Sequence, residues 1–381
     1  MKICFWGNIS DSINGHTPGG GELQIALLAK ALVLAGNEVV IVDPGGKKDF
    51  VSNDGIRVIT VKGWNNGIRI LRTLTHRLPQ FYKLLKEQRA DVYYCRIRDF
   101  RHIFAFWAAR NNDAKFILSL ASDLDVLNFW MRCRHIYFSQ KIDSWFFVSG
   151  LFIEMLQPFL LRNSDMVFAQ HEGQKAILDK KGIVSIINPN LIDLTVISSQ
   201  NNPIKDGFVW VGSLKKRKGI IELYELAIKS PQHKFTVIGQ ASDASGYLYY
   251  EKLKTLPNVT LLGRLSHDAT ILKIASSKAI ISTSMMEGFP NIFIEAWACG
   301  IPVISLYVNP GNVLGKNNLG YFANGSMADL IQKISHYNTI ANIGEDAKRY
   351  VENTHILSKN KISEINAVFE GLIKNKSNKS S

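Results

Sequence analysis

The chain has 381 residues, of which 46% are hydrophobic and 20% charged, and its formal net charge is +13. This length favours two domains of moderate size, each with its own core, and the composition indicates a soluble globular protein. The four cysteines lie far apart without a C-x-x-C pair, which argues against a disulfide framework or a zinc site and fits a reducing compartment.

The positive charge predicts an anionic partner, unless it is only an excess of lysine on a solvated face. Nucleic acid, an anionic membrane surface and a phosphorylated substrate are the candidates. The sequence shows no helix-turn-helix, zinc-finger or RNP-like pattern, so no nucleic-acid partner is expected. The apolar run at the N-terminus breaks at Gly7 and is too short for a signal peptide, so we expect a cytoplasmic protein.

The first half of the chain alternates predicted strands with helices, which is the rhythm of a doubly wound parallel sheet. A glycine-rich loop and a helix over 21–35 follow the first strand, with leucine and alanine at helical spacing. Strands are expected at 2–7, 38–43, 56–62, 90–96, 115–119, 166–170 and 185–188.

The rhythm breaks at the polar run 198–206 and then restarts, which predicts a second sheet of the same kind. Its strands are expected at 208–212, 234–239, 259–262, 278–284 and 302–307. We therefore expect an α/β fold of two Rossmann-like doubly wound domains, 1–200 and 201–357, that face each other across a cleft. Ligands of such sheets bind at the carboxyl ends of the strands. Segment 358–381 would hold a C-terminal helix and a tail that is disordered by composition.

Two segments have the composition of membrane-contacting helices. Segment 66–88 would place apolar side chains on one face among basic residues, with a kink at Pro79, and either lies in a membrane interface or packs on the core. Segment 142–161 is nearly all apolar, but its uncharged stretch is too short to span a bilayer of about 30 Å. A buried helix is the interpretation that we favour for this second segment.

The stretch from Glu287 to Glu295 is the most informative in the sequence. A strand-like run precedes it, and a turn and a helix start follow Glu287: Gly288, Phe289, Pro290 and Asn291. Seven residues separate the two carboxylates, so the first lies in the loop and the second about one turn into the helix. Backbone N–H groups at the helix start suit a phosphate or sugar oxygen. The pattern predicts an anion pocket with two flanking hydrogen-bond acceptors; the alternative is a helix start with two incidental surface glutamates.

The glutamate spacing, the G-F-P turn and the following E-A-W-A-C-G-I-P-V resemble the E-x7-E signature of glycosyltransferase family 4. The resemblance covers nearly all of the chain and is strongest over 207–307. It implies a GT-B fold, with the acceptor side in the N-terminal domain and the donor in the C-terminal one. It further implies retention of configuration, no bound metal or cofactor, and a last helix that packs back on the N-terminal domain. The sequence has no D-x-D motif.

The substrates implied by the resemblance are a nucleotide sugar, UDP- or GDP-linked, and a glycan or lipid-linked acceptor, typically in surface polysaccharide or glycolipid assembly. A lipid-linked acceptor would fit a peripheral contact with the anionic inner face of a membrane. The nucleotide base, the sugar and the acceptor stay open. So do two other functions, a GT-B sugar-nucleotide epimerase and a non-catalytic relative that binds a sugar nucleotide or a polyanion.

A glycine-rich loop before the first helix resembles another element of the family. Gly20 and Gly21 stand in a G-G-x-E pattern, which in relatives lies near the donor diphosphate and the acceptor. A dinucleotide-binding loop with Asp43 as its ribose ligand is the alternative. The spaced G-x-G-x-x-G of such loops is missing, so we favour the diphosphate role.

The basic turn after the strand at 208–212 resembles the V-G-R-L-x-x-x-K-G element of the family. Lys218 matches its lysine, which in relatives neutralises the diphosphate. Ser213 stands where relatives carry an arginine, a departure for which a neighbouring basic side chain would compensate. The candidates are Lys215, Lys216 and Arg217.

Asp123 follows a strand end where relatives often carry His-Asp facing the donor sugar, and Ser122 replaces the histidine. Asp123 is then a base on the acceptor side or a sugar ligand, with a helix cap as the alternative. Arg96 and Arg98 follow the neighbouring strand, where they would meet an acceptor phosphate. Arg264 either lies near the donor phosphates or is structural.

Gln170 and Gln174 resemble the Q-x-x-x-Q element of the family, and we expect His171 between them to be structural. The expected mechanism is front-face substitution, in which the departing phosphate helps to deprotonate the acceptor. In it, Glu287 binds the donor sugar, Glu295 binds the ribose hydroxyls, and Lys218 with the helix-start amides stabilises the leaving diphosphate.

Overall fold

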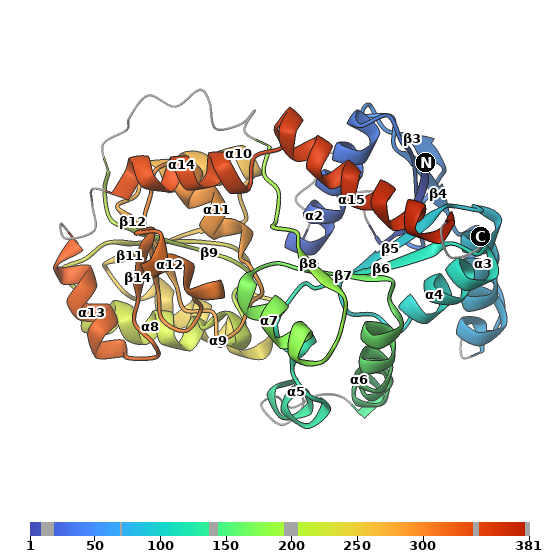
Figure 1. Ribbon diagram of the computed structural model, residues 1–381. Coiled ribbons are helices and arrows are strands. Elements are labelled where there is room, and N and C mark those ends of the chain that lie inside the picture. Colours follow the sequence, from blue (N-terminus) through green and yellow to red (C-terminus); the bar gives the residue numbers. More distant parts are fainter. Residues whose placement is uncertain (9–18, 69–70, 137–143, 194–204, 338–342, 378–381) are drawn as a thin grey trace. The chain divides into compact units, whose positions relative to one another are not determined.

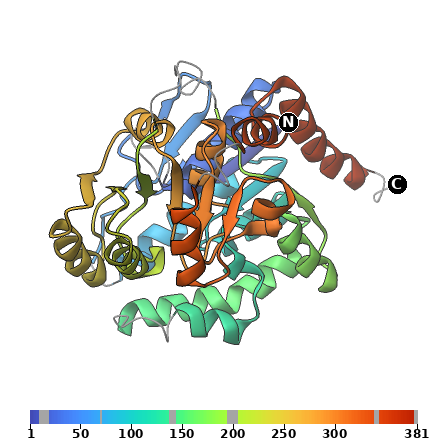
Figure 2. The same cartoon turned by 90° about the vertical axis from the view of Figure 1, so that its left-hand side faces the viewer.

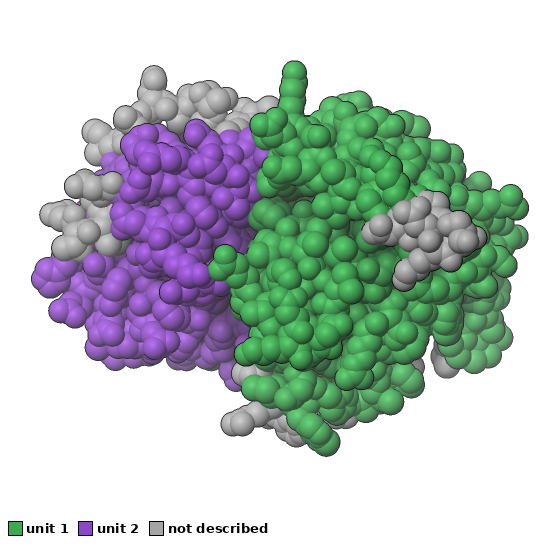
Figure 3. All heavy atoms as spheres, in the orientation of Figure 1, with its two compact units in different colours: residues 1–191, 357–381 green, residues 192–356 purple. Residues whose placement is uncertain are grey.

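The computed structural model describes residues 1–8, 19–68, 71–136, 144–193, 205–337 and 343–377. Figure 1 shows its helices and strands, and Figure 3 its two compact units. Unit 1 comprises Met1–Leu191 together with Leu357–Ser381, and unit 2 comprises Ile192–Ile356. Unit 2 therefore begins at residue 192, earlier than the predicted 201, and ends at residue 356, one residue before the predicted 357.

Unit 1 is built on an eight-stranded sheet, in its described part, with the order β3-β4-β2-β1-β5-β6-β7-β8. Its neighbouring strands are parallel except for the antiparallel β3–β4 pair. The strands are β1 Lys2–Trp6, β2 Glu38–Asp43, β3 Phe50–Val51, β4 Arg57–Thr60, β5 Val92–Arg96, β6 Lys115–Ser119, β7 Met166–Ala169 and β8 Ser185–Ile187. Consecutive apolar residues in β1 and β2 are buried because helices cover both faces of the sheet.

The helices of unit 1 form two hydrophobic cores, one on each face of the sheet. Alternate residues of β1 point to opposite faces, so Trp6 joins one core and Phe5 the other. The helical elements are α2 Gly20–Leu34, η1 Thr73–Arg77, α3 Leu78–Glu87, α4 His102–Asn111, η2 Asp123–Val126, α5 Phe129–Ile136, α6 Ser144–Asn163, α7 Glu172–Lys180 and α15 Lys359–Ser377.

The C-terminal helix α15 packs within unit 1, beside α2 (Figures 1 and 2). The rings of Phe168 in β7 and Phe369 in α15 meet edge to face at 5.8 Å between centroids. The Asn37 side chain donates a 2.7 Å hydrogen bond to Oδ1 of Asn366. The helix continues to Ser377, so the predicted disordered tail is wrong for 374–377, while 378–381 lie outside the described residues.

Unit 2 is built on a six-stranded sheet, again in its described part, with the order β11-β10-β9-β12-β13-β14 and all neighbouring pairs parallel. The strands are β9 Phe208–Val211, β10 Phe235–Ile238, β11 Val259–Gly263, β12 Ala279–Ser282, β13 Val303–Ser305 and β14 Gly320–Phe322. The chain runs outward from β9 in one direction and from β12 in the other. The carboxyl ends of β9 and β12 are therefore the switch point at which α/β sheets bind ligands.

Helices cover both faces of the sheet in unit 2, with α10, α11 and α14 on one face and α8, α9 and α13 on the other (Figure 1). The helical elements are η4 Lys216–Lys218, α8 Ile220–Lys229, α9 Ala244–Lys254, α10 His267–Ala275, α11 Asn291–Ala298, η5 Pro310–Asn312, α12 Val313–Lys316, α13 Met327–Ser335 and α14 Gly344–Thr354. These two mainly parallel sheets, each covered by helices, confirm the predicted fold class.

The predicted helix over 66–88 starts later than expected, because 66–68 are not helical. A π-helical turn over Thr73–Arg77 runs directly into α3, in which Pro79 is the second residue. The side chain of Phe81 is buried, whereas that of Leu74 is exposed. Residues 69–70 lie outside the described residues.

The interpretation of 142–161 as a buried helix is confirmed only in part, since Leu160 and Leu161 are buried in a core but other apolar side chains are exposed. α6 covers Ser144–Asn163, and it buries Glu154 and Gln157 while Phe152 and Met155 are exposed. Residues 142–143 lie outside the described residues.

Candidate active site

Lys218 and Glu287 form an ion pair beside the switch point of unit 2. Lys218 ends the η4 turn that follows β9, and Glu287 lies in the loop between β12 and α11. The ammonium of Lys218 donates a hydrogen bond to Oε1 of Glu287. Both side chains are partly buried, so water screens their charges less than it would on an open surface.

Thr283, just after β12, ties the η4 turn to the switch point. Its hydroxyl donates a 2.8 Å hydrogen bond to the carbonyl of Gly219 and accepts one of 3.0 Å from the indole N–H of Trp210. The backbone N–H of Met285 also donates to the carbonyl of Arg217 at 3.1 Å. These bonds hold the turn against the loop that carries Glu287, so the ion pair rests on a rigid frame.

Gly219 is required for this arrangement. Its backbone has φ of +75°, the left-handed region that glycine adopts without a steric penalty. A Cβ atom at this position would overlap the backbone carbonyl of Thr283. The glycine therefore allows the turn to approach the end of β12, which places Lys218 opposite Glu287.

The ion pair lines a pocket at the carboxyl ends of β9 and β12. Other parts of its wall come from Val211 at the end of β9, Ser282 at the end of β12 and Pro290 before α11. The pocket thus combines a cation, a carboxylate and a helix N-terminus at the position where a parallel sheet binds ligands.

The turn after Glu287 directs α11 toward this pocket. Phe289 is buried, and its ring lies 5.1 Å from that of His355 and 6.1 Å from that of Trp297, between centroids. Pro290 has the extended backbone of an N-cap residue, and α11 starts at Asn291. Gly288 is buried within the same turn. The predicted donor-binding residues 288–291 therefore form one continuous turn and helix start.

Glu295, one turn into α11, is buried and contacts a histidine. Nε2 of His267, the first residue of α10, lies 3.3 Å from Oε1 of Glu295. The hydrogen bond with Glu295 raises the pKa of His267 above its ordinary value, burial opposes this shift, and the negative charge of Glu295 supports it. The pair thus presents a carboxylate whose orientation is set by a neighbouring ring.

The basic turn over 215–218 concentrates positive charge beside the pocket. Burial, together with the charges of Arg217 and Lys218, lowers the pKa of Lys215. A site in which cations destabilise one another is a favourable place for a bound anion, because the anion relieves their repulsion. Ser213 lies in the loop between β9 and this turn, and Arg264 is an exposed residue directly after β11.

Gly20 and Gly21 begin α2 in unit 1, after the predicted loop whose residues 9–18 lie outside the described part. A Cβ atom on Gly21 would come within 2.6 Å of the side chain of Ile97. Close packing of α2 on the segment after β5 is therefore a structural reason for glycine at this position.

Asp123 lies at the start of η2, after β6, and its side chain is held by two residues of another loop and helix. Its Oδ1 atom lies 2.9 Å from Nε2 of His171 and accepts a 2.9 Å hydrogen bond from Nε2 of Gln174. The cap of η2 is formed by Ser122 and Asp125. The alternative that Asp123 is the helix cap is thus wrong, and its carboxylate is partly exposed beside a histidine.

Arg96 at the end of β5 and Arg98 just after it differ from the prediction that they would meet an acceptor phosphate. Arg96 is buried and donates to Oδ1 of Asn190 at 2.7 Å and to the hydroxyl of Ser119 at 3.2 Å. Arg98 forms ion pairs with Asp125 and Glu154. Both guanidinium groups already have acceptors inside unit 1, so they serve its internal structure.

Within the described residues, no three or more His, Cys, Asp or Glu side chains are grouped so that they could hold a metal ion. In that part of the chain, every helix is too short or too polar to cross a membrane. Of the described residues that line the pocket of unit 2, Lys218 carries the positive charge.

The structure brings some of the predicted residues together within each unit. In unit 2, Lys218, Glu287 and Pro290 line one pocket, while Glu295 lies further along the helix that starts there. In unit 1, Asp123 begins η2 after β6, and Gly20 and Gly21 begin α2, the first helix after β1. Two supporting contacts were not predicted, because no sequence motif relates the residues concerned. Thr283 holds the η4 turn, and His267 contacts Glu295.

Known proteins resemble this chain in sequence and in fold. The family model described as "Glycosyl transferases group 1" matches residues 198–355, which contain Lys218, Glu287 and Glu295. An uncharacterized glycosyltransferase of Methanocaldococcus jannaschii is 26% identical over 219 residues, which are 51% of this chain and 48% of the relative. The match therefore spans about half the length of that curated relative.

Solved structures resemble the whole chain. Sucrose-phosphate synthase from Thermosynechococcus elongatus has a TM-score of 0.76 and 15% identity, with 98% of this chain and 100% of that chain covered. Anabaena Alr3699/HepE in complex with UDP and glucose has a TM-score of 0.68 and 15% identity, with 97% and 99% covered. The chain therefore has the GT-B fold, and its second unit carries the sequence pattern of the group 1 glycosyl transferases.

Proposed function

We propose that the protein is a retaining glycosyltransferase that moves a sugar from a UDP- or GDP-linked donor to a hydroxyl group of a glycan or lipid-linked acceptor. The observation that carries this proposal is the Lys218–Glu287 pair in a pocket at the switch point of unit 2. A nucleoside diphosphate sugar needs both a cation for its diphosphate and an acceptor for its hydroxyl groups. The match of residues 198–355 to glycosyl transferases supports the same conclusion.

Lys218 and the start of α11 would stabilise the diphosphate as it leaves. Negative charge grows on the diphosphate when the bond to the sugar breaks, and a cation held in place stabilises that charge without reorganising. The N-terminus of α11 adds partial positive charge at the wall of the same pocket. The loss of one charge-assisted contact costs about 1.5–3 kcal/mol, which is about tenfold to a hundredfold in rate.

The two carboxylates would bind the two sugar rings of the donor. Glu287 lies in the pocket, where it can accept hydrogen bonds from the hydroxyl groups of the transferred sugar. Glu295 is further along α11 and is oriented by His267, which suits it to the ribose hydroxyls. Neither carboxylate needs to act as a nucleophile in front-face substitution. There the bond to the leaving phosphate breaks as the acceptor oxygen bonds the same face of the anomeric carbon, and the phosphate oxygen takes the acceptor's proton.

Residues of unit 1 would serve the acceptor. Asp123, beside His171, is a carboxylate that can accept a hydrogen bond from an acceptor hydroxyl or from the donor sugar. The amides of Gly20 and Gly21 at the start of α2 would contact the diphosphate. Surface polysaccharide or glycolipid assembly in the cytoplasm is the role that we propose for the transfer.

The first test is the binding of nucleotides without any acceptor. UDP, GDP and ADP, followed by their sugars, are compared by the shift that each produces in the melting temperature. We expect one nucleoside diphosphate to stabilise the protein more than the others, and its sugar to act as donor. Anabaena Alr3699/HepE was solved with UDP and glucose, so UDP-glucose is the first donor to try.

The second test is transfer activity in variants of the pocket. We expect Lys218→Ala and Glu287→Gln to fold normally and to lose about tenfold to a hundredfold or more of the rate, because each removes one charge-assisted contact. Lys229→Ala and Glu225→Gln break an exposed ion pair on α8 of the same unit and serve as matched controls with unchanged rates. NMR of the product shows whether the anomeric configuration is retained.

Three results would contradict the proposal. Rates like those of the wild type in both pocket variants would remove the assigned roles. A sugar nucleotide that changes without any acceptor would indicate an epimerase. A sugar nucleotide that binds tightly but stays unchanged with every acceptor would indicate a non-catalytic binding protein.

A further inference from the structure

Helix α6 buries two polar side chains beside Leu160 and Leu161 on its inner side and exposes apolar side chains on its outer side. Glu154 and Gln157 on its inner side are buried, with 1% and 4% of their surface exposed. Phe152, Met155 and Phe159 are 60%, 63% and 42% exposed. At about 100° per residue, these three lie about 100–160° around the helix from Glu154, so they form one outward stripe.

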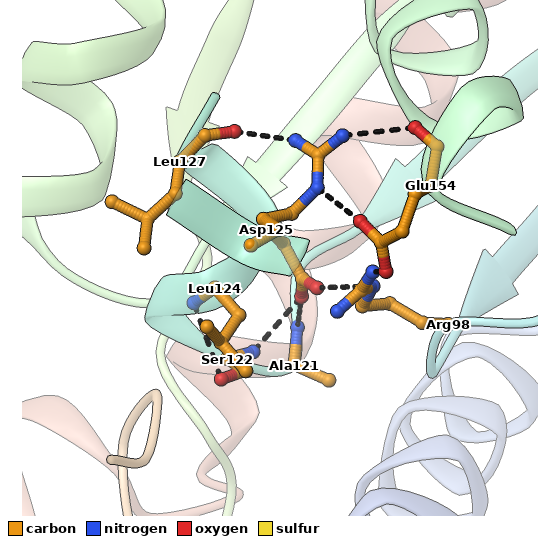
Figure 4. A network of polar contacts seen from close by, with 8 residues as sticks. Arg98, Ala121, Ser122, Leu124, Asp125, Leu127 and Glu154 are labelled. Carbon is orange, nitrogen blue, oxygen red and sulfur yellow. Dashed lines mark hydrogen bonds and ion pairs between the residues drawn. The ribbon is translucent and has the colours of Figure 1, made fainter. Parts of the chain in front are cut away.

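A network of buried charges holds α6 in this orientation (Figure 4). Glu154 forms ion pairs with Arg98, which follows β5, and with Arg132 in α5. Nη2 of Arg132 also donates to the carbonyl of Glu154 at 2.9 Å. Arg98 further contacts Asp125 at 3.4 Å, and Asp125 accepts hydrogen bonds from the backbone of Ala121 and Ser122. Because an unpaired buried charge is costly, α6 cannot rotate to bury its apolar stripe.

The neighbouring helix α5 exposes apolar side chains in the same way. Arg132 and Cys133 are buried, whereas Trp130 is 78% and Met131 48% exposed. The two helices contact each other and lie at one edge of unit 1 in Figures 1 and 2. We call the five side chains the α5–α6 surface: Trp130, Met131, Phe152, Met155 and Phe159. Exposed apolar side chains gathered in this number mark an interaction site.

The chemistry of this surface favours a lipid bilayer as its occupant. Tryptophan and phenylalanine are typical of side chains that insert at the interface of a membrane. Apart from the buried Arg132–Glu154 pair, residues 129–163 hold three Lys or Arg against one Asp, and the whole chain carries +13, so an anionic surface attracts it. The same charge opposes association of two copies, because like charges repel. The contact would be interfacial, since neither described helix is long and apolar enough to cross a membrane.

We propose that the protein docks on an anionic lipid surface through the α5–α6 surface, which the buried Arg98–Glu154–Arg132 network holds outward. The docking residues lie outside segment 66–88, for which a membrane interface was one of two alternatives. In that segment Leu78, Phe81 and Leu85 are buried, whereas Ile68, Leu71 and Leu74 are exposed. Docking would bring unit 1 to the membrane at which a lipid-linked acceptor is held. Vesicle binding needs no sugar nucleotide, so it is tested independently of the proposed function.

The test is co-sedimentation of the full chain with vesicles of phosphatidylcholine, with and without phosphatidylglycerol. We expect the wild type to sediment with the anionic vesicles and to be released by high salt. The variant Trp130→Ser/Phe152→Ser/Met155→Ser should lose at least about tenfold in vesicle affinity, because these residues supply most of the apolar contact. A matched control, Ile228→Ser/Tyr247→Ser/Leu248→Ser, removes three exposed apolar side chains of unit 2 and should bind like the wild type.

A melting temperature equal to that of the wild type shows that the triple variant is folded. Should it unfold, Trp130→Phe provides the second measurement, since brominated lipid should quench the fluorescence of the wild type more strongly than that of the variant. Failure of the wild type to bind anionic vesicles, or equal binding by the triple variant, overturns the proposal. A further result would also overturn it. If light scattering shows a dimer that the triple substitution dissociates, and the wild type does not bind vesicles, the surface joins two copies of the chain.

Discussion

His267 carries a charge that depends on its contact with Glu295. Its pKa is raised above 6.5 by the hydrogen bond with Glu295, against the opposing effect of burial. A raised pKa in the folded state means that protonation favours folding. The contribution to stability is therefore complete below the ordinary pKa near 6.5, and it is lost as the pH rises through the higher pKa of the folded protein.

We predict that His267→Gln weakens the dependence of the free energy of unfolding on pH. The wild type should exceed the variant in free energy of unfolding by a larger margin at about pH 6 than at about pH 9, because only protonated His267 attracts Glu295. Denaturant titrations at both pH values measure the margin. A margin for His267→Gln that stays constant with pH would refute the charged pair.

Single residues differed in how far the sequence revealed their roles. Glu287 and Lys218 were recognised from local motifs, since each lies in a short pattern with a characteristic turn. Ser213, in the place of the family's arginine, leaves open which cation assists Lys218. Partners such as Thr283 were not predictable, because a lone threonine at a strand end has many ordinary roles.

At the scale of elements, the η4 turn shows how backbone geometry prepares a site. Lys215, Lys216, Arg217 and Lys218 repel one another, and Gly219 closes the turn in the left-handed conformation against the end of β12. Hydrogen bonds from Thr283 and Met285 offset the cost of holding four cations together. The turn is therefore the element on which the position of Lys218 depends.

We predict that Gly219→Ala destabilises unit 2 and impairs donor binding. The left-handed backbone costs an alanine about 1–2 kcal/mol, and the overlap with the carbonyl of Thr283 adds to this. Gly263→Ala is the matched control, because Gly263 has φ of +67° but no atom within 4 Å of its Cβ position. Thermal unfolding should show a larger loss for Gly219→Ala than for the control. Equal losses would mean that close approach to β12 does not matter.

Helix α6 explains why the interpretation of an apolar segment as buried holds for only one side of the helix. Its composition predicted a core helix, since most of its residues are hydrophobic. The orientation is decided by Glu154, whose cationic partners come from α5 and from the segment after β5. Such partners are separated from α6 in sequence, so the hydrophobic pattern alone could not identify the exposed face.

At the scale of the whole molecule, the chain returns to its first unit at the end. Ile365, Phe369 and Leu372 of α15 are buried in the core that α2 also forms. The second unit is thus an insertion, in sequence, between two parts of unit 1. The core of unit 1 is therefore complete only when residues that follow unit 2 in the sequence have packed into it.

We predict that deletion of residues 357–381 destabilises unit 1 selectively. Burial of each large apolar side chain contributes about 1.5–3 kcal/mol, so the loss of three should lower the stability of unit 1 by about 5 kcal/mol or more. Calorimetry should show an earlier transition for unit 1 and an unchanged one for unit 2. Deletion of 378–381 alone is the control and should leave both transitions in place. A shift in both units after the longer deletion would mean that they unfold together.

The sequence by itself determined the alternation of strands and helices, the two parallel sheets and the E-x7-E loop. Apolar periodicity, glycine and proline act on the backbone over a few residues, so these features are local. The predicted cleft between the domains stays a prediction. Only the tertiary structure decided that Lys218 and Glu287, 69 positions apart, share one pocket, and which side of α6 meets solvent. Both features depend on the order of the strands and on partner residues that are distant in the sequence. These bring charged side chains together that no local sequence pattern connects.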